Sequence, residues 1–159
     1  MPQLDLNGGK ANPIPKPVYT SKSDEWGTPQ DLFDKLDREF HFTLDPCANK
    51  RRPLRRDLLC YDIQDNVLEQ DWSDHRVFIN PPYSGKNIEW WCEKIYQEKD
   101  HAEVIVLLIP LNKGSTEYFH EYIYPFAEIR MIRGRLKFYP LVSQRVRGTP
   151  NGSMLCIIR

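Results

Sequence analysis

The stretch Asn80-Pro81-Pro82-Tyr83 places a side-chain amide, peptide carbonyls and a phenol ring within a single turn. The β-branched and aromatic residues 77–79 before it predict a buried strand. Pro81 holds Asn80 out of the helical region, and Pro82 does the same to Pro81, so the strand ends abruptly in a stiff turn. Open α/β sheets bind their ligands at the carboxyl ends of strands. The stretch therefore predicts a site that grips a planar ring carrying an exocyclic amine.

Such an amine is a poor nucleophile, because its lone pair is delocalised into the ring. The Asn80 side-chain oxygen and the Pro81 carbonyl can each accept one amine hydrogen, which makes the nitrogen more tetrahedral and aims its lone pair at an electrophile. Tyr83 can stack on the ring, a contact worth about 1–3 kcal/mol. We expect Asn80, Pro81, Pro82 and Tyr83 to be the catalytic residues. The alternative is a proline-rich turn that only closes a strand.

Length and composition limit the class of protein. The 159 residues predict one domain, with residues 1–22, rich in Pro and Gly, as a flexible arm and residues 23–159 as the folded unit. The 22 basic and 22 acidic residues balance, so the net charge gives no indication of a nucleic-acid partner. Four widely spaced cysteines indicate reduced thiols rather than a zinc site or disulfides. Without a signal peptide or a membrane-spanning apolar run, we expect a cytoplasmic protein that contacts no membrane and binds no metal.

The elements that must position the turn follow from periodicity and end signals. Thr28, Pro29 and Asp31 predict a helix start, with Thr28 as N-cap, Pro29 as the first helical residue and Asp31 as the acid of a capping box. Further helices are expected from residue 84 or 85 and from residue 115. Residues 142–151 predict a mobile loop. The expected strands are residues 42–44, 58–61, 77–79, 104–109, 127–132, 136–139 and 154–158.

Five motifs follow one another along the chain. They are Trp26-Gly27-Thr28-Pro29, Asp45-Pro46-Cys47-Ala48, Asp65-Asn66-x-Leu68 with Trp72, Asn80-Pro81-Pro82-Tyr83, and Arg133-Gly134-Arg135 with Phe138. Together they resemble the phage-type DNA N6-adenine methyltransferases, the phage Dam-like family. The resemblance covers most of the chain after residue 23. It implies an α/β fold, a Rossmann-like methyltransferase sandwich with a mostly parallel central sheet flanked by helices.

The resemblance also implies S-adenosylmethionine as cofactor. In this family an acid after the first central strand, here Asp45, meets the ammonium group or the ribose of the cofactor. The glycines that usually follow are replaced by Cys47-Ala48-Asn49, as in the glycine-poor phage-type members. Either Asp65 or Asn66 meets the cofactor adenine, and Trp72 is expected in the core. The implied cofactor-binding residues are Trp26, Thr28, Pro29, Asp45, Pro46, Cys47, Ala48, Asp65 and Asn66.

The last quarter of the chain carries many basic side chains, and from Arg130 onward it has no acidic one. Arginine and glutamine suit phosphates and base edges, so the loop expected at residues 142–151, with Gln144, Arg145 and Arg147, is the predicted DNA-reading element. The alternative is a basic edge that only keeps the protein soluble. For the earlier basic run between Lys50 and Arg56 we favour a solvated loop over a phosphate contact. The expected nucleic-acid-binding residues are Arg133, Arg135, Gln144, Arg145 and Arg147.

The implied activity is site-specific transfer of a methyl group to adenine N6 in double-stranded DNA, on a base flipped out of the duplex. The family suggests protection of phage DNA from host restriction, in a bacterial or phage-infected cell. We expect the protein to be a monomer or weak dimer. Two alternatives use the same turn or the same fold. One is an amino-methyltransferase acting on RNA or on a protein glutamine. The other is a catalytically silent DNA-binding protein.

Overall fold

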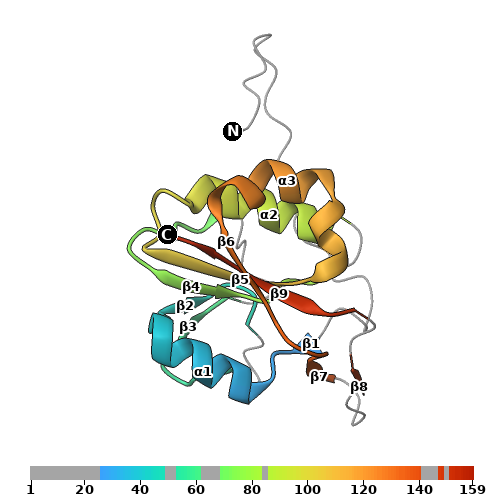
Figure 1. The fold of residues 1–159 in the computed structure, drawn as a ribbon. Coiled ribbons are helices and arrows are strands. Elements are labelled where there is room, and N and C mark those ends of the chain that lie inside the picture. The colour runs from blue at the N-terminus through green and yellow to red at the C-terminus, as the bar shows by residue number, and fades with distance from the viewer. Residues whose placement is uncertain (1–25, 49–52, 62–68, 84–85, 141–146, 149–150) are drawn as a thin grey trace.

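The computed structural model describes residues 26–48, 53–61, 69–83, 86–140, 147–148 and 151–159 of the chain. The flexible arm expected at residues 1–22 lies outside these ranges. Within them the strands form two sheets, one of six strands and one of three. The large sheet is the centre of the molecule, and helices cover both of its faces (Figure 1).

The main sheet has the strand order β3-β2-β4-β5-β9-β6. In that order its strands are β3 (Leu59–Cys60), β2 (Leu44–Asp45), β4 (Arg76–Ile79), β5 (Val104–Pro110), β9 (Ser153–Ile158) and β6 (Glu128–Met131). The first four pair in parallel, whereas β9 runs antiparallel to both β5 and β6. The expected α/β sheet is present, as a mixed sheet in which β9 alone is reversed.

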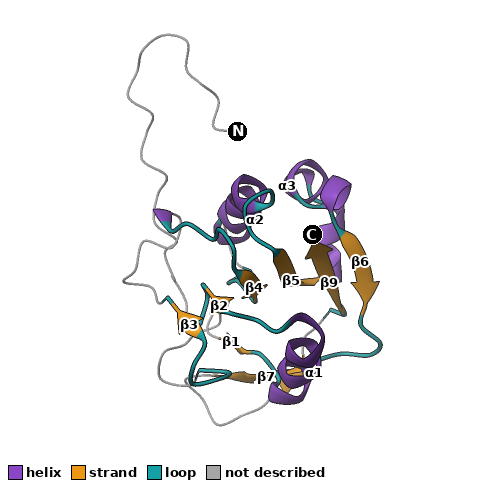
Figure 2. Ribbon diagram, turned by 90° about the vertical axis from the view of Figure 1, so that its left-hand side faces the viewer, coloured by secondary structure: helices purple, strands orange, loops and turns teal. Residues whose placement is uncertain are grey.

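The helices form two layers (Figure 2). Helix α1 (Gln30–Phe40) lies on one face of the main sheet, and α2 (Asn87–Glu98) and α3 (Glu117–Tyr122) lie on the other. Short 3-10 turns, η3 (Leu111–Ser115) and η4 (Tyr124–Phe126), flank α3. In the part of the chain that the structure describes, no helix is both long and apolar enough to cross a membrane.

Strand β5 divides the core because its side chains alternate between the two faces. Ile105, Leu107 and Ile109 join the cluster under α2 and α3, and the intervening Val104, Val106 and Leu108 join the cluster under α1. Each of these six side chains is at most 7% exposed. The continuous apolar run is thus a strand, as predicted, and it is buried on both faces. Trp72, with no exposed surface, is in the core as expected.

A small antiparallel sheet joins the start of the described chain to residues of its last quarter. It has the order β1-β7-β8, with β1 (Trp26–Gly27), β7 (Lys137–Pro140) and β8 (Arg147–Gly148). Gly134, with φ of +78°, makes the turn expected between β6 and β7. The prediction of a loop at residues 142–151 is wrong for residues 147–148, because these two residues form a strand that pairs with Lys137 and Phe138.

The start of α1 differs from the prediction. The helix begins at Gln30, the extended Pro29 occupies the N-cap position, and no side chain caps the helix. Thr28 is therefore not the N-cap, and Asp31 does not close a capping box. The physical reason is that the Thr28 hydroxyl is used elsewhere: it accepts a hydrogen bond from the side-chain amide of Asn80.

Candidate active site

The reversal of strand order lies between β2 and β4. From β2 the chain goes to β3 on one side and then to β4 on the other, and both β3 and β4 are parallel to β2. In open α/β sheets the ligand binds outside the carboxyl ends of the strands at such a switch point. Asp45 is the last residue of β2, and Asn80 directly follows β4. The two predicted motifs are thus brought to one edge of the sheet.

The Asn80 amide is held on both sides. Its Nδ2 donates to Thr28 Oγ1 at 2.9 Å, and its Oδ1 accepts from Tyr83 Oη at 2.6 Å. Pro81 and Pro82 are buried, while Asn80 is half-buried. An amide oxygen has two lone pairs, so Oδ1 keeps one acceptor position beside the bond from Tyr83. The turn therefore presents an oriented acceptor, and its catalytic role stays a prediction.

Tyr83 is fixed by its hydroxyl and by its ring. Besides Asn80, the hydroxyl lies 3.4 Å from the Leu108 carbonyl oxygen, and the ring packs against the core cluster under α2 and α3. Burial raises the pKa of the phenol above its ordinary value, and the nearby Cys47 side chain raises it further. Tyr83 therefore stays protonated and remains a donor to Asn80.

Asp45 is a buried carboxyl group, only 4% exposed. Its Oδ1 accepts the backbone N–H of Cys47 at 3.1 Å, and no basic side chain of the described residues forms an ion pair with it. Burial raises the pKa of Asp45 to about 7, although the bond from Cys47 lowers it. An uncompensated buried acid of this kind is suited to a ligand that brings a cation or hydroxyl groups.

The Cys47 thiol links the two motifs. Burial and the nearby Asp45 carboxylate raise the pKa of the thiol well above its ordinary value, so it is neutral and unreactive. Cys47 and Tyr83 pack against the same core cluster. Cys47 also lies close enough to Tyr83 to affect the pKa of its phenol, so the predicted cofactor loop and the predicted catalytic turn approach each other there.

Comparison with known proteins gives the family. A family model described as DNA N-6-adenine-methyltransferase (Dam) matches residues 17–159. The chain belongs to this family. It is also 31% identical over 104 residues to the DNA N-6-adenine-methyltransferase of Haemophilus phage HP1, a match that covers 63% of this chain and 58% of the phage protein. The chain thus spans less than two thirds of the length of that relative. The predicted family resemblance is confirmed.

Other predicted members of the Dam-family cofactor site lie in different places. The backbone of Trp26 is in β1 and pairs with Pro140. Pro29 and Pro46 are buried. The backbone N–H of Ala48 donates to the Asp45 carbonyl oxygen at 3.4 Å and closes a turn. Asp65 and Asn66 lie outside the described residues. The sequence did not reveal the bond between Thr28 and Asn80, because no local pattern connects side chains that are 52 residues apart.

The basic residues divide into two groups. Arg133 and Arg135 are exposed between β6 and β7, and Arg147 lies in β8, so part of the predicted DNA-reading set lies on or beside the small sheet. Gln144 and Arg145 lie outside the described residues. The small sheet also contains β1, whose strand leads directly into Thr28. Arg147 is therefore joined, through the backbone pairing of β8 with β7 and of β7 with β1, to the strand that leads into Thr28.

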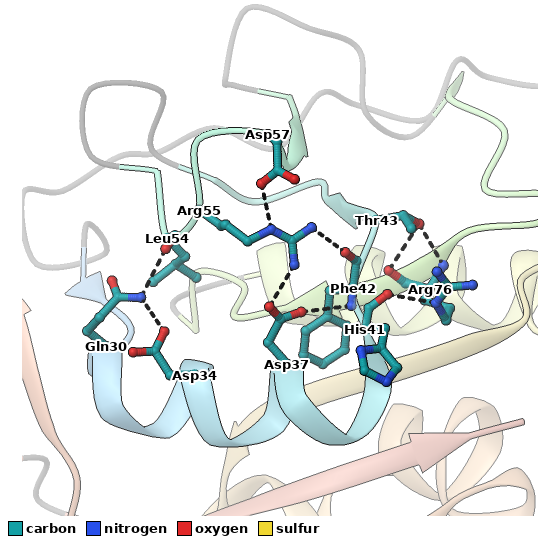
Figure 3. A network of polar contacts seen from close by, with 10 residues as sticks. All are labelled: Gln30, Asp34, Asp37, His41, Phe42, Thr43, Leu54, Arg55, Asp57 and Arg76. Atoms are coloured by element: carbon teal, nitrogen blue, oxygen red, sulfur yellow. Dashed lines mark hydrogen bonds and ion pairs between the residues drawn. The ribbon is translucent and has the colours of Figure 1, made fainter.

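The second group is the basic run between Lys50 and Arg56, and its member Arg55 lies in a network of polar contacts beside α1 (Figure 3). Its guanidinium binds Asp37 and Asp57, each at 2.6 Å, and donates to the Phe42 carbonyl oxygen at 2.7 Å. Asp37 also accepts the Phe42 N–H at 2.9 Å, so the network ties α1 to the chain entering β2. Arg55 thus belongs to an internal network, which argues against a phosphate contact but also differs from the expected solvated loop. Within the described residues, no cluster of His, Cys, Asp or Glu that could hold a metal ion is present.

Proposed function

We propose that this protein transfers the methyl group of S-adenosylmethionine to N6 of adenine in double-stranded DNA. The observation that carries the proposal is the oriented Asn80 amide at the switch point, beside the buried carboxyl of Asp45. Membership of the DNA N-6-adenine-methyltransferase family supports the same chemistry. On this proposal the mixed sheet is a Rossmann-like methyltransferase sandwich, and its switch point is where cofactor and target base meet.

The residues of the site fit the cofactor. Asp45 is a buried acceptor without a cation among the described residues, and the α-ammonium group or the ribose hydroxyls of S-adenosylmethionine would satisfy it. When bound, the cofactor supplies an activated methyl group on a sulfonium centre. Pro46, Cys47 and Ala48 would line the same loop, and Asp65 or Asn66 would meet the adenine of the cofactor.

The chain's own groups prepare the nucleophile. Asn80 Oδ1 and the Pro81 carbonyl oxygen accept the two hydrogens of the N6 amine and so direct its lone pair outward. With the cofactor bound, the amine would form a C–N bond with the methyl carbon as the C–S bond breaks, and the resulting ammonium would lose a proton to water. Pro82 keeps the turn rigid, and Tyr83 stacks on the flipped base. Arg133, Arg135, Gln144, Arg145 and Arg147 contact the DNA.

The test is a methylation assay with three kinds of acceptor. Purified protein is incubated with isotopically labelled S-adenosylmethionine and with unmethylated duplex DNA, RNA of the same sequence, or a glutamine-containing peptide, and products are identified by mass spectrometry. We expect label in N6-methyladenine from DNA. Label only in RNA or in glutamine amide would contradict the proposal, as would cofactor and DNA binding without any transfer.

A further inference from the structure

We propose that Thr28 is a positioning residue that sets the orientation of the Asn80 amide, rather than a ligand of the cofactor. The inference rests on the proposed function, because it concerns the step in which Asn80 acts. Thr28 is 7% exposed, and its Oγ1 accepts the Asn80 Nδ2 hydrogen at 2.9 Å. The contact joins a residue before α1 to a residue after β4.

The orientation of the amide decides whether the turn works. An asparagine side chain turned by 180° about its last torsion presents an NH2 group where the oxygen was. In that orientation the site would offer a donor to an amine that also donates, and the amine would not be held. In the structure the amide has the productive orientation, with Thr28 bonded on the nitrogen side and Tyr83 on the oxygen side.

The backbone around Thr28 is held at both ends, so its hydroxyl is a fixed acceptor. On one side Gly27 pairs with Tyr139 in the small sheet. On the other side Pro29 accepts the first helical hydrogen bond of α1, from Phe33 N at 3.1 Å. A hydroxyl placed between a paired strand and a helix start orients its partner without having to reorganise during the reaction.

The two roles for Thr28 make different kinetic demands. A cofactor ligand would change the dissociation constant for S-adenosylmethionine. A residue that orients Asn80 would instead change the rate of methyl transfer in the fully bound complex, because the error lies in how the amine is presented. A group that acts only on the transition-state geometry lowers kcat and leaves ground-state binding alone.

The experiment compares Thr28→Val, Thr28→Ala and Thr28→Ser by single-turnover methylation of duplex DNA at saturating cofactor, with calorimetry of cofactor binding. We expect Val and Ala to slow transfer by roughly 10–100-fold, the range typical when a group that orients a functional side chain is removed. The cofactor dissociation constant should stay within about twofold, and Ser, which keeps the hydroxyl, should recover most of the rate. Two hydroxyl-free variants of different size are used so that a steric defect in one does not decide the result.

Thr43→Val is the matched control. The Thr43 hydroxyl accepts Arg76 N at 2.9 Å at the amino ends of β2 and β4, so its loss removes a half-buried hydrogen bond at the opposite end of the same strands. It should lower thermal stability and leave the transfer rate unchanged. A raised cofactor dissociation constant with a normal saturated rate in Thr28→Val would overturn the inference. So would full activity in both hydroxyl-free variants, or failure of Ser to restore the rate. An inactive wild-type protein would instead contradict the proposed function.

Discussion

Tyr83 Oη donates to Asn80 Oδ1 at 2.6 Å, so the aromatic residue of the turn bonds the acceptor that the target amine needs. The sequence assigned Tyr83 a stacking role only. The hydroxyl adds a second role, because it occupies one lone pair of the oxygen and so fixes the direction of the other. The ring and the hydroxyl can be separated experimentally.

We predict that Tyr83→Phe reduces methyl transfer by no more than about tenfold, since one charge-neutral hydrogen bond contributes about 0.5–1.5 kcal/mol. Tyr83→Ala should also weaken binding of DNA with an extrahelical target base, by the loss of about 1–3 kcal/mol of stacking. Fluorescence of 2-aminopurine at the target position measures base flipping in both variants. Equal base flipping by Tyr83→Ala and the wild-type protein would remove Tyr83 from the base-stacking role.

The raised pKa of the Asp45 carboxyl group predicts how cofactor binding depends on pH. Its pKa is raised to about 7, so in the free protein the carboxyl is mostly protonated below that pH. A cationic ligand favours the ionised form and lowers the pKa, so binding releases a proton. Affinity for S-adenosylmethionine should therefore fall as pH is lowered from about 7 to about 5, where the α-ammonium group stays charged. Calorimetry in buffers of different ionisation enthalpy measures the released proton.

The matched variant is Asp45→Asn, which keeps the shape of the side chain and cannot ionise. It should bind the cofactor more weakly at pH 7 and show no proton release between pH about 5 and 7. A pH-dependence that persists unchanged in Asp45→Asn would show that another group titrates on binding.

The buried pair formed by Lys94 and Glu98 predicts a stability effect. Glu98 accepts the Trp72 backbone N–H at 3.0 Å and lies 2.5 Å from Lys94 Nζ, which also donates to the Gln70 carbonyl oxygen. The pair therefore anchors the chain before β4 to α2. Glu98→Ala leaves a buried ammonium without its partner and should lower the free energy of unfolding by about 3–5 kcal/mol.

Glu103→Ala is the comparison, because its pair with Arg76 is exposed and a surface pair contributes about 0–1 kcal/mol. Urea denaturation of both variants measures the difference. Equal losses of unfolding free energy would mean that burial of the Lys94–Glu98 pair has no special weight.

Arg133 and Arg135 predict the salt dependence of DNA binding. Both are exposed between β6 and β7, and neither forms an ion pair with a described residue. If each neutralises one phosphate, replacing both by Ala should lower affinity and reduce the slope of log K against log salt by about 2. Fluorescence anisotropy at several salt concentrations measures the slope.

Arg130→Ala is the control, since Arg130 is already paired with Glu39 and Glu128 at 2.8 and 2.6 Å. It should leave the salt slope unchanged. A slope that responds to Arg130 and not to Arg133 and Arg135 would place the DNA on the β6 edge instead.

The sequence predicted the parts of this protein whose signals are local. The apolar run of β5 and the proline turn after β4 can be predicted from the sequence, because their residue patterns are compatible with few other structures. The predicted start of α1 is wrong because the Thr28 hydroxyl, an ordinary capping group, is bonded to the Asn80 side chain. Asn80 is 52 residues away in the chain. Strand β8 was missed because two residues carry no periodicity, and only their pairing with β7 makes them a strand.

The same limit applies to the basic residues. Composition alone cannot separate Arg55, which is bound to Asp37 and Asp57, from the exposed Arg133 and Arg135. Which arginine is committed to an internal network depends on how α1 packs beside β2, and that is a property of the tertiary structure.

The central claim is that the Asn80 amide orients the N6 amine of adenine, and Asn80→Ala tests it most directly. Single-turnover methylation of duplex DNA should yield N6-methyladenine with the wild-type protein and none above background with Asn80→Ala, while calorimetry shows S-adenosylmethionine bound equally well by both. N6-methyladenine formed at the wild-type rate by Asn80→Ala would contradict the account.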